Sequence, residues 1–168
     1  MAQDCLILNI LTFKQLQMNK IEILGKNTTS KKILIISGVH GDELTPIYCT
    51  YLLSLIDYTK FDFHTITILS AINYDGIVKN TRDIPNTKTS DLNRMFTTEV
   101  KISEETELTK YINDNDIIID IHSSPNCDEF VLINQDLNAN SYIEFCDTHN
   151  IHYLNRYSSA NTIKKYCF

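Results

Sequence analysis

The chain has 168 residues, and its 43% hydrophobic content is enough to fill one core without help from disulfides. Its formal net charge of -6 argues against a protein that grips phosphate backbones, so we expect no nucleic-acid partner. The five cysteines are scattered and include no C-x-x-C pair, which favours a reducing compartment. With no basic leader and no apolar run of about 18 residues, the sequence predicts one cytoplasmic domain over residues 1–168 and no membrane partner.

Short runs rich in Ile, Leu and Val predict β-strands, because they are brief and β-branched. In chain order these runs are residues 5–11, 20–24, 32–37, 65–71, 117–121 and 130–134. Two of them, 32–37 and 117–121, are almost continuously apolar, which is typical of strands covered on both faces in a parallel sheet.

Three segments between these runs predict helices, namely residues 44–58, 103–113 and 139–148. Strands that alternate with helices predict an α/β fold with a mostly parallel or mixed sheet and helices on both faces. Residues 73–98 show turn residues but little periodicity, so we expect a long loop there. Loops of this length inside a compact domain are usually functional.

A candidate metal site begins directly after the predicted strand at 32–37. There His40 and Glu43 follow a turn that Gly38 and Gly41 make tight enough for the two side chains to converge. Imidazole nitrogen and carboxylate oxygen are both good zinc ligands. A lone H-x-x-E pair is weak evidence, because surface residues produce the same spacing by chance.

His122 is the third candidate ligand, because it follows the apolar run at 117–121. In an open α/β sheet, ligands bind just beyond the carboxyl ends of the strands, where both histidines fall. The alternative is a histidine that only caps its strand by a hydrogen bond. Catalytic zinc commonly has three protein ligands and one open position, so His40, Glu43 and His122 predict one Zn2+ per chain.

The arginines indicate the kind of substrate. The chain has only three, Arg82, Arg94 and Arg156, and the first two lie in the predicted loop. A guanidinium matches a carboxylate with two parallel hydrogen bonds, so we expect a small carboxylate-bearing substrate. The alternative is a solvated loop with chance positive charges.

Four motifs in order resemble the zinc carboxypeptidase superfamily over residues 37–124: H-x-x-E at 40–43, N-Y-D-G at 73–76, D-L-N-R at 91–94 and D-I-H-S at 120–123. The text at residues 38–46 and 91–96 is most similar to the succinylglutamate desuccinylase and aspartoacylase branch. The N-Y-D-G motif instead resembles the N-P-D-G of carboxypeptidases and murein peptide amidases, with Tyr74 in place of proline.

The resemblance implies that His40, Glu43 and His122 hold the zinc ion. It also implies that Arg82 polarises the scissile carbonyl and that Asp91 orients His40 from behind. Such an arrangement suits hydrolysis, because zinc acidifies a water and an arginine stabilises the oxyanion.

Asn93 and Arg94, by the same resemblance, bind the free carboxylate of an N-acyl amino acid or of a peptide carboxyl terminus. The leading expectation is therefore a zinc-dependent hydrolase that cleaves an amide bond adjacent to a free carboxylate, as a deacylase does. The alternatives are a metallocarboxypeptidase, a murein peptide amidase, or a zinc- and carboxylate-binding module with impaired catalysis.

The general base of the family, a glutamate well downstream of the third ligand, has no counterpart in the sequence. After His122 the only glutamates are Glu129 and Glu144, and neither resembles it. We therefore expect the chain to lack the C-terminal part of the family fold and to hydrolyse amides slowly on its own. A homo-oligomer is one arrangement that would cover the open edge of a shortened sheet.

Overall fold

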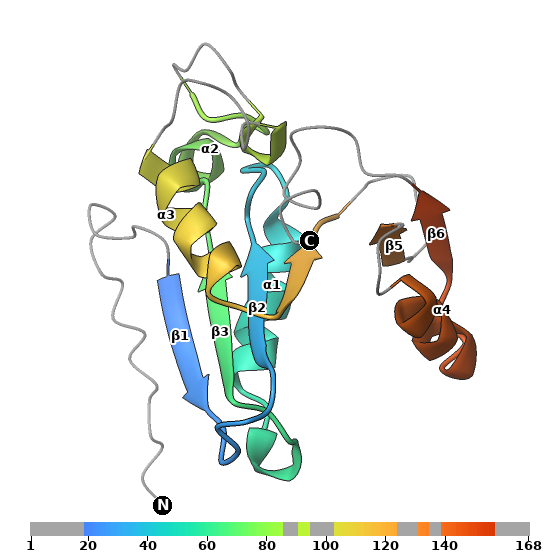
Figure 1. Cartoon of the computed structure of the whole chain (residues 1–168). Helices are drawn as coiled ribbons and strands as arrows, with labels where there is room; N and C mark the ends of the chain where they lie inside the picture. Colours follow the sequence, from blue (N-terminus) through green and yellow to red (C-terminus); the bar gives the residue numbers. More distant parts are fainter. Residues whose placement is uncertain (1–18, 86–90, 95–102, 124–130, 135–138, 157–168) are drawn as a thin grey trace, which may run out of the picture.

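The structure, a computed structural model, describes residues 19–85, 91–94, 103–123, 131–134 and 139–156. Four strands form its main sheet in the order β1-β3-β2-β4 (Figure 1). They are β1 (Asn19–Leu24), β2 (Lys32–Ser37), β3 (Thr65–Ser70) and β4 (Ile117–Ile121). β2 runs parallel to both of its neighbours, and β1 lies antiparallel to β3. The predicted strand at residues 5–11 lies outside the described residues.

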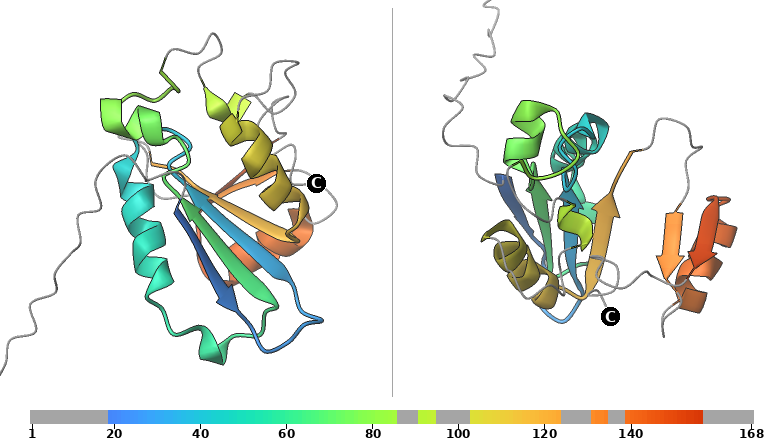
Figure 2. Two further views of the ribbon diagram at one scale, coloured as in Figure 1. Left: turned by 90° about the vertical axis from the view of Figure 1, so that its left-hand side faces the viewer. Right: turned by 90° about the horizontal axis from the view of Figure 1, so that it is seen from above.

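Helices α1 (Leu44–Ser54) and α3 (Ser103–Asn113) cover opposite faces of this sheet (Figure 2). Leu34 and Ile36 of β2 pack in one cluster with Leu108 of α3. Ile35, on the opposite face of the strand, packs in another cluster with Leu53 of α1. One strand thus serves two cores, and this is why its sequence is apolar without alternation. The predicted α/β fold, with a mostly parallel sheet and helices on both faces, is confirmed.

The helix predicted over residues 44–58 is shorter than expected. α1 ends at Ser54, and the N–H of Leu55 hydrogen-bonds to the carbonyl three residues earlier, which closes the last turn. Asp57 then starts a separate 3-10 turn, η1 (Tyr58–Lys60), by accepting a backbone hydrogen bond with its side chain. The aspartate cap therefore interrupts an apolar pattern that by itself favours one longer helix.

The prediction of a loop throughout residues 73–98 was wrong in part. Helix α2 (Tyr74–Lys79) lies there, and a 3-10 turn, η2 (Leu92–Arg94), follows. Asn73 starts α2 by accepting the N–H of Gly76 at 2.9 Å. A helix of 6 residues is too short for its period to show in the sequence.

A second, two-stranded sheet follows the main one in the chain. Its parallel strands are β5 (Val131–Asn134) and β6 (Tyr153–Arg156), and helix α4 (Ala139–Thr148) connects them. The helix predicted at 139–148 therefore forms, and so does the part of the strand predicted at 130–134 that the structure describes, residues 131–134. Within the described parts of the chain, no helix has the length and apolar character needed to cross a membrane.

Candidate metal centre

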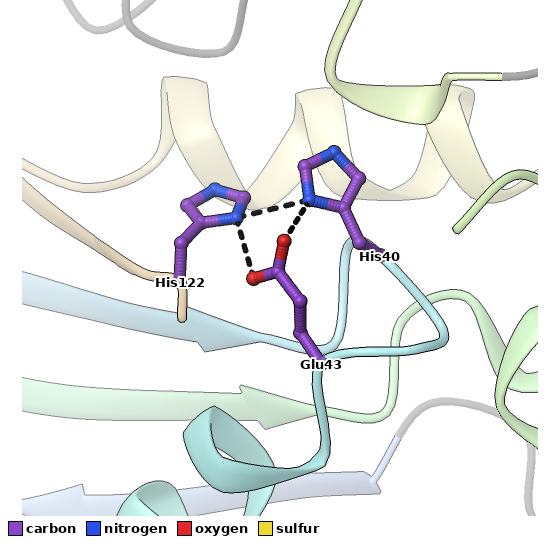
Figure 3. Close-up of side chains that lie close together, drawn as sticks. All are labelled: His40, Glu43 and His122. Carbon is purple, nitrogen blue, oxygen red and sulfur yellow. Dashed lines mark hydrogen bonds and ion pairs between the residues drawn. The ribbon is translucent and has the colours of Figure 1, made fainter. Parts of the chain in front are cut away.

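The candidate site lies at the carboxyl ends of β2 and β4. Ser37 pairs in register with Ile121, so the residues that follow these parallel strands emerge side by side. His122 follows β4 directly, and residues 38–43 form the loop after β2. Figure 3 shows that the side chains from these two segments turn towards one another.

Two glycines allow the loop after β2 to turn. Gly38 has a φ of +71°, in the left-handed region, and a Cβ there would lie 3.0 Å from the Cα of Ala71. A Cβ on Gly41 would lie 2.1 Å from the carbonyl carbon of Gly76. The loop is therefore packed against the start of α2, which fixes the direction of the side chains it carries.

The three predicted ligands form one cluster. His40 Nδ1 lies 2.7 Å from Glu43 Oε1 and 3.2 Å from His122 Nδ1. His122 Nδ1 lies 3.1 Å from Glu43 Oε2 (Figure 3). One nitrogen or oxygen atom from each residue lies within 4.8 Å of the other two, so the group could hold a metal ion.

Each histidine is held from behind by a carboxylate. His40 Nε2 lies 3.1 Å from Asp91 Oδ1, and His122 Nε2 lies 2.7 Å from Asp120 Oδ2. A carboxylate only accepts hydrogen bonds, so each Nε2 carries the proton and donates it. In a neutral ring the lone pair then lies on Nδ1, the atom that faces the other histidine and Glu43. When both rings are neutral, two lone pairs and the carboxylate of Glu43 converge, and this set of ligand atoms fits a divalent metal ion such as zinc.

Charges within the cluster shift its pKa values. Burial lowers the pKa of His122, but hydrogen bonds to Asp120 and Glu43 outweigh burial and raise that pKa to about 9. Burial raises the pKa of Glu43, but hydrogen bonds from the two histidines and from the backbone N–H of Ser123 hold it well below its usual range. The cluster therefore attracts positive charge, and a metal ion that binds there must displace protons.

Arg82 is anchored through its backbone and borders the cluster with its side chain. Its carbonyl oxygen accepts hydrogen bonds from the N–H of Gly41 at 3.3 Å and from the side-chain amide of Asn73 at 3.1 Å. Its terminal nitrogens donate to Glu43 Oε1 and to Asp91 Oδ2, each at 3.4 Å. Because the side chain is 47% exposed, it stays accessible to a ligand from solvent.

Asp91 connects the second arginine to the cluster. Arg94 Nε donates to Asp91 Oδ2 at 3.2 Å, and the backbone N–H of Asn93 donates to Asp91 Oδ1 at 3.0 Å. The Arg94 side chain is 63% exposed. All the site residues predicted from the sequence therefore lie in one neighbourhood, although Asn93 enters these contacts through its backbone.

Two side chains at the site were missed by sequence reasoning. Asp120 holds His122, and Asn73 anchors Arg82 while it caps α2. A signal existed for Asp120, since residues two apart on a strand point to the same face and Asp120 therefore shares the face of His122. Asn73 was recognised only as part of a motif, because its contact with Arg82 depends on the fold.

The sequence profile of the succinylglutamate desuccinylase/aspartoacylase catalytic domain matches residues 29–159. No protein of curated function matches the sequence. Among solved structures, the product-bound ectoine utilization protein EutE (DoeB) from Ruegeria pomeroyi is similar with a TM-score of 0.68 and 18% identity. The match covers 88% of this chain and 48% of that protein.

Two further solved structures share the fold. A succinylglutamate desuccinylase from Chromobacterium violaceum has a TM-score of 0.64 and 18% identity, with 88% of this chain and 51% of that one covered. The tripeptide-bound cell shape determinant Csd4 from Helicobacter pylori has a TM-score of 0.64 and 17% identity, with 90% and 47% covered. At such identities the likeness concerns the fold, and the chain spans about half the length of these proteins.

Proposed function

The chain belongs to the succinylglutamate desuccinylase/aspartoacylase catalytic-domain family, and from that premise we propose that it acts in zinc-dependent hydrolysis. The proposed reaction cleaves an amide bond next to a free carboxylate and releases an amino acid from its N-acyl group. One observation carries the proposal: three lone-pair donors, on His40, Glu43 and His122, converge beside two accessible arginines. Such a pairing of a metal site with carboxylate-binding groups suits an acylated amino acid.

One Zn2+ per chain is the proposed cofactor. Zinc with three protein ligands supplies a water of lowered pKa and a Lewis acid for a carbonyl oxygen. His40 and His122 contribute neutral nitrogens, because the carboxylates behind them keep each proton on Nε2. Glu43 contributes a carboxylate whose pKa lies well below its usual range, so it is ionised at any physiological pH.

The two arginines take different roles in the proposed reaction. Arg82 lies against Glu43, so its guanidinium stands where a carbonyl next to the metal site develops negative charge. Arg94 donates through Nε to Asp91, and its side chain is the more exposed of the two. Its guanidinium group is therefore suited to bind the carboxylate of a substrate that arrives from solvent. We assign Asn93 to the same carboxylate, and Asp91 to the orientation of His40.

A metallocarboxypeptidase or murein peptide amidase is the second candidate. It is supported by the N-Y-D-G motif at residues 73–76 and by the shared fold with Csd4, whose structure holds a tripeptide. The same arginines would then bind the carboxyl terminus of a peptide. A third candidate is a zinc- and carboxylate-binding module with impaired catalysis: Glu144 is exposed on α4, and Glu129 lies outside the described residues.

The test measures zinc content first and hydrolysis second. We expect one zinc ion per chain in protein purified without chelators, and we expect His122→Ala to weaken binding of added zinc. The zinc-loaded chain is then assayed against N-acyl amino acids and short peptides, with light scattering to give its mass. We expect slow turnover from the monomer, because neither Glu129 nor Glu144 resembles the general base of the family. A positioned base typically contributes a factor of about 10²–10⁴ to the rate.

The controls separate the candidates. Zinc-dependent release of amino acid from N-acyl substrates above the rate of His122→Ala supports the deacylase, and release from peptides alone supports the second candidate. Zinc binding with no turnover of either substrate supports the impaired module. Absence of bound zinc, with His122→Ala indistinguishable from the wild type, overturns the proposed function.

A further inference from the structure

Asp120 is the least exposed carboxylate at the site. Its side chain is 5% exposed, compared with 11% for Glu43 and 16% for Asp91. In the parallel pair β2–β4 it stands in register with Ile36, which is fully buried on the face that α3 covers. Asp120 therefore carries its charge in surroundings that screen it poorly.

Among the described residues, Asp120 also makes fewer polar contacts than Glu43 or Asp91. Its Oδ2 lies 2.7 Å from His122 Nε2, and among the described residues its Oδ1 has no hydrogen-bond partner. Asp91, in contrast, is contacted by both Arg82 and Arg94, which share its charge. A buried carboxylate is costly unless a cation compensates it, and within the described part of the chain Asp120 reaches a cation through His122.

We propose that Asp120 is a positioning residue that makes His122 a metal ligand. It fixes the proton on Nε2 of His122, so that the lone pair of Nδ1 faces the cluster. Its negative charge also makes Nδ1 a stronger electron-pair donor to the metal ion. The inference rests on the proposed zinc site and adds that the two histidines are supported unequally. Because Asp91 shares its charge with two arginines and Asp120 directs its charge at His122, the loss of Asp120 weakens metal binding more than the loss of Asp91 does.

The experiment compares zinc dissociation constants, measured at one pH by competition with a chromophoric chelator. The variants are Asp120→Asn, which keeps the shape, Asp120→Ser, which leaves room for a water, and Asp91→Asn. The matched control is Asp116→Asn, because Asp116 lies exposed at the other end of β4 and accepts the backbone N–H of Lys32 at 2.8 Å. Thermal unfolding of each metal-free variant accompanies the titrations.

We expect both Asp120 variants to weaken zinc binding by about 10–100-fold, Asp91→Asn to weaken it less, and Asp116→Asn to leave it unchanged. The visible spectrum of the Co2+-loaded protein should change in Asp120→Asn although all three ligands are retained. In a His122→Ala background the cost of Asp120→Asn should vanish, because the positioned ligand is gone. A residue that only supports the fold would give neither result.

Unchanged zinc affinity in both Asp120 variants overturns the inference and leaves the proposed zinc site standing. The inference is equally overturned if Asp120→Asn costs as much in the His122→Ala background as in the wild type. Failure of the proposed function gives a different pattern, because the wild type and Asp116→Asn then bind no zinc either, and the inference falls with it.

Discussion

Asn73 offers a quantitative test of how the site is built. The residue is 1% exposed, and its side chain makes two hydrogen bonds within the described part of the chain: Oδ1 accepts the N–H of Gly76 at 2.9 Å, and Nδ2 donates to the carbonyl of Arg82 at 3.1 Å. Asn73→Ala removes both bonds. The N–H of Gly76 is then a buried donor without an acceptor, whereas the Arg82 carbonyl keeps the N–H of Gly41.

The expected cost follows from these contacts. An unsatisfied buried donor at a helix start costs about 1–3 kcal/mol, and the second bond about 0.5–1.5 kcal/mol. We therefore expect Asn73→Ala to lower the free energy of unfolding by about 2–4 kcal/mol. At about 2–4 °C per kcal/mol for a chain of this size, the midpoint of thermal unfolding should fall by about 5–15 °C.

The assay is urea and thermal unfolding of the metal-free protein, so that bound metal does not contribute to stability. Asn27→Ala is the matched control: its side chain also accepts a backbone N–H, that of Thr29 at 3.0 Å, but in an exposed turn. We expect Asn27→Ala to cost less than about 1 kcal/mol. If Asn73→Ala costs no more than Asn27→Ala, the reasoning about the buried cap is refuted.

Two further predictions concern the arginines and the glycine turn. Arg94→Ala should chiefly raise KM, because Arg94 is assigned to the carboxylate of the bound substrate, whereas Arg82→Ala should chiefly lower kcat, because Arg82 is assigned to charge that develops in the transition state. Equal losses of kcat in both variants, with KM unchanged, would contradict this division. Gly41→Ala should destabilise the fold by more than about 3 kcal/mol and weaken zinc binding, because its Cβ would lie 2.1 Å from the Gly76 carbonyl carbon. The control is Asp42→Ala, which changes an exposed residue next to Gly41 and should leave the free energy of unfolding and zinc binding unchanged. If Gly41→Ala is as stable as the wild type, the loop can move away from α2 and the prediction is wrong.

The proposed metal ligands could be placed from the sequence because the strand ends and the turn that carry them depend on local rules. His40 and His122 each follow an apolar run, and parallel strands end at one edge of the sheet, so their convergence required only that the two strands be neighbours. Gly38 and Gly41 indicated the tight turn that brings Glu43 close to His40. These features act over a few residues, and the sequence shows them directly.

The supporting residues could not be placed in the same way. The proposed role of Asp120 depends on its burial beside Ile36 on the face that α3 covers, and burial of that kind is a property of the assembled core. Asn73 matters because Arg82 comes close to it in space, nine residues further along the chain. α2 escaped prediction because six residues are fewer than two turns, and its formation depends on the cap that Asn73 provides.

The separation of the ligands along the chain has a consequence for folding kinetics. His40 and His122 lie 82 residues apart, and they meet only when β4 has paired with β2 at the edge of the sheet. Closing so long a loop is a slow, non-local step, and no partly folded chain without β4 contains the complete cluster. A metal ion that needs all three ligands thus gives no help to the search for the native sheet. If the proposed zinc binds, it would slow the detachment of β4 from β2, so its contribution is expected in the rate of unfolding and in resistance to proteolysis.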